Sequence, residues 1–127
     1  MVLLDTCTLL WLIAYQENLS ANAKKAISNS EQVFVSAISN FELGLKIKKN
    51  IIEIAQPLQQ WWQKALQLHG LQELPITSII AGLSTELPDL HRDPADRFII
   101  ATAMQNSLTI LTPDSHIHAY PNVKVVW

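Results

Sequence analysis

The stretch HRDPADRFIIATA, residues 91–103, predicts a helix that begins with two carboxylates. Pro94 suits the first helical position, because the N–H that proline lacks would have no partner there. Asp93 is then the N-cap and Asp96 lies in the first turn, where the helix dipole favours negative charge. The residues after Arg97 are nearly all apolar, which is typical of a helix buried on most of its faces. The stretch therefore indicates either a well-capped core helix or a buried helix that directs acidic groups at one place.

The composition predicts one ordered domain that spans residues 1–127. Hydrophobic residues make up 49% of the chain and charged residues 16%, a balance too apolar for disorder. The net charge of −2 argues against a generic basic nucleic-acid binder. Lys46, Lys48 and Lys49 form the densest basic cluster, which we interpret as the solvated end of a helix. The single cysteine, Cys7, excludes an internal disulfide and a cysteine-based zinc site.

The sequence also predicts where the protein acts. Its longest apolar run, residues 9–14, is too short to cross a bilayer. No basic segment followed by an apolar run opens the chain, since Asp5 comes almost at once. We therefore expect a cytoplasmic protein.

Short apolar runs alternate with helical segments along the chain. The predicted strands cover residues 2–4, 33–35, 71–74, 108–111 and 123–126. The predicted helices cover residues 6–15, 21–28, 57–69 and 77–86, together with one that begins at Ser36 or Ser39 and ends near Lys49. This alternation predicts an α/β protein with a three-layer α/β/α fold and a central, mainly parallel sheet.

Four acidic residues are expected at one edge of that sheet. Asp5 ends the first strand, and Asp114 closely follows the fourth. Glu42 and Asp96 lie in the first turns of helices that flank the sheet. Open parallel sheets bind ligands beyond the carboxyl ends of their strands, so the four carboxylates can share one site. Glu42 has a second interpretation, because SNFE at residues 39–42 has the form of a capping box.

Carboxylates this close to one another repel and raise each other's pKa values unless a cation neutralises them. Oxygen ligands suit Mg²⁺ or Mn²⁺. Without a nucleophilic cysteine or a Ser–His pair, such a site favours metal-assisted hydrolysis of a phosphate ester. His116 and His118 alternate on a predicted surface turn, and we interpret them as solvated. Trp61 and Trp62 lie on the apolar face of their helix, which favours core packing over stacking on nucleic-acid bases.

Four short motifs occur in a recognisable order over essentially the whole chain. They are VLLDT at residues 2–6, VS at 35–36 with FEL at 41–43, HRDPADR at 91–97 running into IIATA at 99–103, and LTPD at 111–114. With these motifs the chain resembles a PIN domain, and specifically the VapC family of toxin ribonucleases. The resemblance implies the three-layer fold, Mg²⁺- or Mn²⁺-dependent endonuclease activity on RNA, and neutralisation by a cognate VapB-like antitoxin.

The resemblance also assigns site residues. The acidic site of the family carries over to four metal-binding and catalytic positions, Asp5, Glu42, Asp96 and Asp114. Thr6 and Thr112 match hydroxyl positions beside that site, and Asp93 belongs to a subgroup pattern that makes it a further candidate ligand. The aromatic residue usual soon after the last acid is absent, since His116 and Ile117 stand there.

The first predicted helix, residues 6–15, is apolar around nearly its whole circumference. A domain of this size has limited interior in which to bury it, so we expect a homodimer. We also expect an antitoxin segment along an apolar groove near the site, with an antitoxin arginine paired with the acids.

Three other functions are alternatives to the toxin. A phosphatase of the haloacid dehalogenase type needs a second aspartate two residues after the first, and Cys7 occupies that position. A non-catalytic module that binds RNA or protein would most simply lack one of the four acids, yet all are present. A PIN-like nuclease of RNA processing or quality control keeps the same site, and a small antitoxin gene immediately upstream would argue against it.

Overall fold

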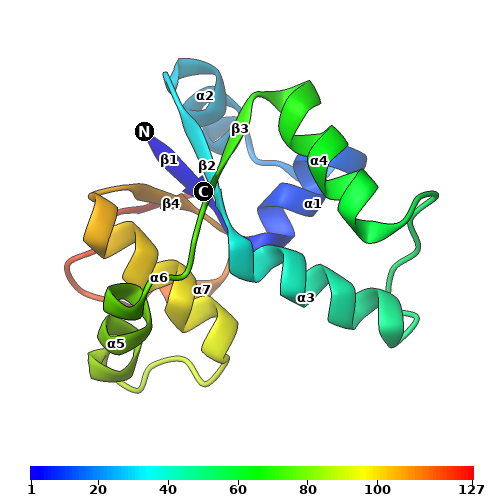
Figure 1. Ribbon diagram of the computed structural model, residues 1–127. Helices are drawn as coiled ribbons and strands as arrows, with labels where there is room; N and C mark the ends of the chain where they lie inside the picture. The colour runs from blue at the N-terminus through cyan, green and yellow to red at the C-terminus, as the bar shows by residue number, and fades with distance from the viewer.

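The computed structural model describes residues 1–127 and contains one five-stranded sheet in the order β3-β2-β1-β4-β5 (Figure 1). Every neighbouring pair of strands is parallel, which confirms the predicted α/β class. The strands are β1 (Val2–Leu4), β2 (Val33–Ser36), β3 (Leu71–Leu74), β4 (Thr109–Leu111) and β5 (Val125–Val126). Because the strands are parallel, their carboxyl ends all lie at the same edge of the sheet.

Helices connect the strands. They are α1 (Thr6–Ala14), a short 3₁₀ helix η1 (Gln16–Asn18), α2 (Ala21–Asn29), α3 (Ala37–Lys48), α4 (Leu58–His69), α5 (Ser78–Glu86), α6 (Pro94–Asn106) and α7 (Ser115–His118). In Figure 1, α1, α3 and α4 lie on one side of the sheet and α5, α6 and α7 on the other. This arrangement confirms the three predicted layers. None of the helices is both long and apolar enough to cross a membrane.

Two hydrophobic cores hold the layers together, one on each face of the sheet. Successive side chains of β1 point to opposite faces, so Leu3 and Leu4 enter different cores. Trp62 of α4 is completely buried with Leu4, which confirms core packing for that tryptophan, and its Nε1–H donates to Glu73 Oε1 at 2.7 Å. Ile99 of α6 is buried in the other core. The burial of α6 on the sheet fixes its N-terminal end beside the carboxyl ends of the strands.

The structure corrects three local predictions. Ser36, and not Ser39, caps α3, so Glu42 is not part of a capping box. A short helix, α7, replaces the predicted turn after Asp114, because the Asp114 side chain accepts the N–H of His116 and caps it. The last strand is shorter than predicted and covers only Val125–Val126, after a turn that ends at Asn122 with a left-handed backbone (φ 63°).

Candidate functional site

The four predicted site residues, Asp5, Glu42, Asp96 and Asp114, all line one cleft at the carboxyl edge of the sheet. The cleft has a volume of about 350 Å³. Asp93 lines it as well, so five carboxylates face the same space. The remaining lining residues are Thr6, Cys7, Leu10, Leu43, Lys46 and Pro113.

Asp5 is the most deeply buried of these acids, with 5% of its surface exposed. Its Oδ1 accepts the N–H of Thr8 at 2.8 Å and thereby caps α1, while its Oδ2 accepts the hydroxyl of Thr112. Burial raises the pKa of Asp5, and the hydrogen bonds from Thr112 and Thr8 only partly offset this effect. The Thr112 hydroxyl also accepts the N–H of Asp114 at 3.0 Å. One hydroxyl thus joins the acids that follow β1 and β4.

Glu42 is positioned by Thr6, the residue that opens α1. The Thr6 hydroxyl donates to Glu42 Oε1 at 2.5 Å and lies 2.9 Å from the Ser39 hydroxyl. Because Thr6 has a single proton and gives it to Glu42, Ser39 must donate to Thr6. Burial raises the pKa of Glu42, and the hydrogen bond from Thr6 works in the opposite direction. Ser39, which the capping-box interpretation paired directly with Glu42, therefore acts on Glu42 only indirectly, through its hydrogen bond to Thr6.

Asp93 and Asp96 occupy the predicted positions at the start of α6. Asp93 is the N-cap and accepts the N–H of Ala95 at 3.0 Å. Oxygen atoms of Asp93, Asp96 and Glu42 also lie within 4.8 Å of one another. Burial, reinforced by the negative charges of Asp93, Glu42, Asp5 and Asp114, raises the pKa of Asp96 to about 8. The site thus concentrates more negative charge than its own hydrogen bonds neutralise.

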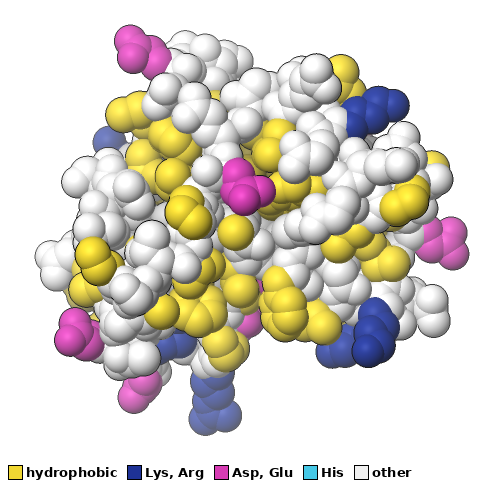
Figure 2. Space-filling model, in the orientation of Figure 1, with side chains coloured by type: hydrophobic (Ala, Val, Ile, Leu, Met, Phe, Trp, Pro, Cys, Tyr) yellow, Lys and Arg dark blue, Asp and Glu magenta, His cyan; other side chains and the backbone are white.

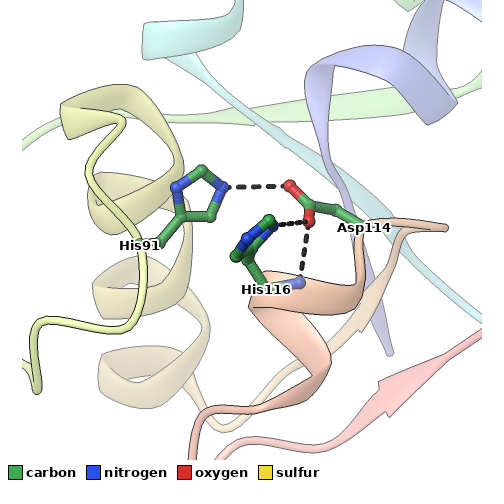
Figure 3. A group of neighbouring side chains, drawn as sticks. All are labelled: His91, Asp114 and His116. Atoms are coloured by element: carbon green, nitrogen blue, oxygen red, sulfur yellow. Dashed lines mark hydrogen bonds and ion pairs between the residues drawn. The ribbon is translucent and has the colours of Figure 1, made fainter.

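Asp114 differs from the other acids because histidines surround it. Its Oδ2 lies 2.9 Å from His91 Nε2, and its Oδ1 lies 3.2 Å from His116 Nδ1 (Figure 3). The backbone N–H of His116 donates to the same Oδ1 at 2.8 Å. Partial burial acts to raise the pKa of Asp114, but the hydrogen bonds from His91 and His116 prevail and hold it below its ordinary value.

The prediction that His116 and His118 are solvated is confirmed, but each also has a hydrogen-bond partner. Both side chains are largely exposed, yet His116 contacts Asp114 and the Nε2 of His118 lies 2.8 Å from the carbonyl oxygen of Thr112. They have these partners because Ile117, between them, is completely buried and anchors α7 to the core. His91 was not predicted as a site residue. Its place two residues before Asp93 in the stretch 91–103 was the only signal in the sequence.

Two further side chains influence what the cleft can do. Lys46 lines it, so the basic cluster is not entirely a solvated helix end, although Lys48 and Lys49 are exposed. Burial, together with the charge of Asp5, raises the pKa of the Cys7 thiol to about 11. A thiol with that pKa is protonated at neutral pH and is no nucleophile.

The donor set of the cleft fits a hard divalent cation. Five carboxylates supply oxygen atoms, and burial disfavours the charged forms of Asp5, Glu42 and Asp96 and raises their pKa values. A cation among them would stabilise the charged forms, and oxygen-rich sites of this kind bind hard metal ions. A parallel α/β sheet with an acidic cleft at its carboxyl edge thus defines the class of the protein as a metal-dependent α/β enzyme.

The chain belongs to the PIN domain family, whose model matches residues 2–123. It is 33% identical to ribonuclease VapC22 of Mycobacterium tuberculosis over 129 aligned positions, which cover 99% of this chain and 98% of that relative. PIN domains are nucleases that use divalent metal ions, in agreement with the carboxylate cluster.

Solved structures share the fold. A toxin–antitoxin complex from Klebsiella pneumoniae contains a chain with a TM-score of 0.70 and 24% identity, matched over 100% of this chain and 97% of that one. VapBC2 from Rickettsia felis, bound to a DNA fragment from its promoter, gives a TM-score of 0.67 and 19% identity over 99% and 98% of the two chains.

Proposed function

We propose that this protein is a metal-dependent endoribonuclease and the toxin of a toxin–antitoxin pair. The observation that carries the proposal is the convergence of five carboxylates on one cleft in a PIN-family chain that is one-third identical to a ribonuclease over its whole length. We place the activity in the cytoplasm, where RNA is translated.

We assign Asp5, Glu42, Asp96 and Asp114 as the residues that would hold the metal, with Asp93 as a further ligand. The ion would be Mg²⁺ or Mn²⁺, because the strong metal ligands that line the cleft are all carboxylate oxygen atoms. When bound, such an ion activates water and stabilises negative charge on the phosphate.

The side chains around the acids hold them ready for that ion. Thr112 fixes the orientation of Asp5, and Thr6 fixes that of Glu42, so neither carboxylate has to reorganise when a cation enters. Lys46 places a positive charge at the cleft, where it can attract and orient an RNA phosphate. No side chain of the cleft is a competent covalent nucleophile, which favours direct attack by water on the phosphodiester bond.

The cleft continues into an apolar groove between α3 and the start of α6. The groove has a volume of about 340 Å³ and shares Glu42, Lys46 and Asp93 with the acidic cleft. Phe41 and Ile51 line it with 59% and 62% of their surfaces exposed. Figure 2 shows hydrophobic side chains gathered over α3 and α6 on this face of the molecule.

We propose that a segment of the antitoxin covers this groove. Its apolar residues would bury the exposed side chains of α3, and an arginine beyond them would reach the carboxylates and neutralise them in place of the metal. Both the structural neighbours named above are complexes of a toxin with its antitoxin.

RNA cleavage by the purified protein tests the enzymatic part of the proposal. Cleavage should require Mg²⁺ or Mn²⁺, stop when a chelator is added, and fall by at least 100-fold in Asp5→Asn. Asp89→Asn is the matched control, because Asp89 is fully exposed outside the cleft, and it should cut like the unmodified protein. Undiminished cleavage in the presence of the chelator would refute the metal mechanism.

Co-expression with the product of the neighbouring upstream gene tests the partner. Phe41→Ser should weaken the complex at least tenfold and release toxicity, because it removes apolar surface from the groove. Leu68→Ser is the matched control, since Leu68 is also strongly exposed but lies on α4. Equal weakening by both variants would show that the groove is not the contact surface.

A further inference from the structure

We propose that His91 is a positioning residue of the metal site, held in place by Arg97 and Tyr120. Its Nε2–H would orient the two carboxylates that close one side of the site, Asp96 and Asp114. The inference rests on the proposed function, because it assumes that these acids bind a divalent metal.

The backbone of the loop before α6 is fastened by one arginine. Arg97 lies one turn into α6, and its two terminal nitrogens donate to the end of α5 and to the loop that follows it, over distances of 2.8 to 3.3 Å. The acceptors are the backbone carbonyl oxygens of Ser84, Leu87, Pro88 and His91. A planar guanidinium with five N–H groups can satisfy several carbonyls at fixed angles, which a lysine cannot do.

Tyr120 holds the same loop through its hydroxyl group. Its hydroxyl donates to the Pro88 carbonyl at 2.8 Å and accepts the backbone N–H of His91 at 2.9 Å. Arg97 Nη1 lies 3.3 Å from that hydroxyl, so the two side chains act as one unit. Tyr120 is buried and Arg97 is nearly so. Together they fix the position of the His91 backbone, from which the ring extends.

The ring of His91 is then held in one tautomer. The backbone N–H of Asp93 donates to His91 Nδ1 at 3.2 Å, and only an unprotonated nitrogen can accept it. The ring proton therefore lies on Nε2. That nitrogen hydrogen-bonds to Asp114 Oδ2 at 2.9 Å and also lies 2.9 Å from Asp96 Oδ2, so it contacts both carboxylates.

This geometry favours a donor role over metal ligation by the histidine. His91, Asp114 and His116 lie together in Figure 3, with ligand atoms within 4.8 Å of one another, and could suggest a transition-metal site. A metal on Nε2 would force the ring proton onto Nδ1, where it would meet the N–H of Asp93. As a donor, His91 instead sets the separation of two acids, in the way that side chains behind a metal site orient its ligands.

Mn²⁺ binding to the purified protein, measured by calorimetry, tests the inference without reference to RNA cleavage. His91→Ala should lower Mn²⁺ affinity by about 10- to 100-fold, the usual effect of removing a partner behind a ligand. His91→Gln should recover most of that affinity, because the glutamine amide N–H reaches about as far as Nε2. His69→Ala is the matched control, since His69 ends α4 and lies outside the cleft, and it should bind Mn²⁺ normally.

A double-mutant cycle tests whether Arg97 affects metal binding by positioning His91 or only by stabilising the loop before α6. Arg97→Lys should weaken Mn²⁺ binding, and combining it with His91→Ala should weaken binding no further than His91→Ala alone, because Arg97 acts through His91. Additive losses would overturn the role of Arg97. Nitrogen NMR of the metal-free protein should place the ring proton of His91 on Nε2.

The outcomes distinguish this inference from the proposed function. If the unmodified protein binds no divalent metal, both fail. If it binds Mn²⁺ and His91→Ala binds it equally well while remaining folded by circular dichroism, the role of His91 alone is refuted.

Discussion

Replacing Asp96 by asparagine should make the metal-free protein more stable, although the substitution removes a native carboxylate. Asp96 is largely buried, with 15% of its side chain exposed, and four other carboxylates line the same cleft. Asparagine keeps the shape and an oxygen that can accept from His91 Nε2, but it carries no charge. The substitution therefore removes the cost of burying this carboxyl among other acids, which the unmodified protein meets by taking up a proton on folding, and it leaves the packing of α6 intact.

The magnitude follows from the raised pKa of this carboxyl. At about 1.4 kcal/mol for each pH unit, a change from 3.8 to about 8 sets an upper limit of about 6 kcal/mol. Relaxation and solvent in the open cleft reduce the effect, so we expect a gain on the order of 2 kcal/mol at pH 7, or about 5–10 °C in melting temperature.

The pH dependence has a definite sign. The folded protein holds the Asp96 proton up to about pH 8, whereas the unfolded chain releases it near 3.8. Between these values the folded state binds more protons, so the contribution of Asp96 to the free energy of unfolding falls as pH rises. In Asp96→Asn this loss should disappear, and the two proteins should diverge most near and above pH 8.

Thermal melting with and without Mn²⁺, repeated across this pH range, provides the assay. Added Mn²⁺ should stabilise the unmodified protein and have little effect on Asp96→Asn. Asp89→Asn serves as the control, because an exposed carboxylate 3.6 Å from Arg97 contributes little to stability. A metal-free Asp96→Asn that melts below the unmodified protein at pH 8 would show that repulsion does not govern this site.

Three other predictions follow from the same contacts. Asp93→Ala should be less stable than Asp93→Asn by about 1 kcal/mol in chemical denaturation, because alanine cannot accept the Ala95 N–H and asparagine can; equal stabilities would contradict the cap. Thr112→Val should lower the free energy of unfolding by about 1–3 kcal/mol, since it leaves Asp5 Oδ2 and the Asp114 N–H without the hydroxyl partner; urea denaturation measures this loss, and an unchanged midpoint would count against it. Light scattering should find a homodimer, because Trp11 on α1 remains only half-buried; a monomer at high concentration would refute this expectation.

The sheet and the acidic edge could be predicted because each depends on local signals. The short apolar runs before Asp5 and Asp114 predicted two strands, and Pro94 predicted the start of α6, because proline is favoured at the first helical position. Once those strands are parallel, their carboxyl ends meet, and the acids that follow them meet too. The cap at Asp93 was predicted for the same local reason.

Contacts between distant segments could not be predicted in this way. The local pattern at residues 39–42 favoured a capping box, but the Thr6 hydroxyl, 36 positions away from Glu42, competes successfully for that carboxylate. The fastening of the His91 loop depends on Tyr120, which lies 29 positions further along the chain. Such pairs form only after the layers have packed, so no spacing in the sequence predicts them.

Three of the five acids, Asp5, Asp93 and Asp114, also cap helices α1, α6 and α7. Asparagine caps a helix about as well as aspartate does, and the codons for the two residues differ by one base. On the proposed function, a single mutation at Asp5 or Asp114 gives a disarmed protein that still folds and still presents its groove. Selection against the toxin would thus leave behind decoys that occupy the antitoxin, and a cell that carries both a decoy and an active copy would be less protected than one with the active copy alone.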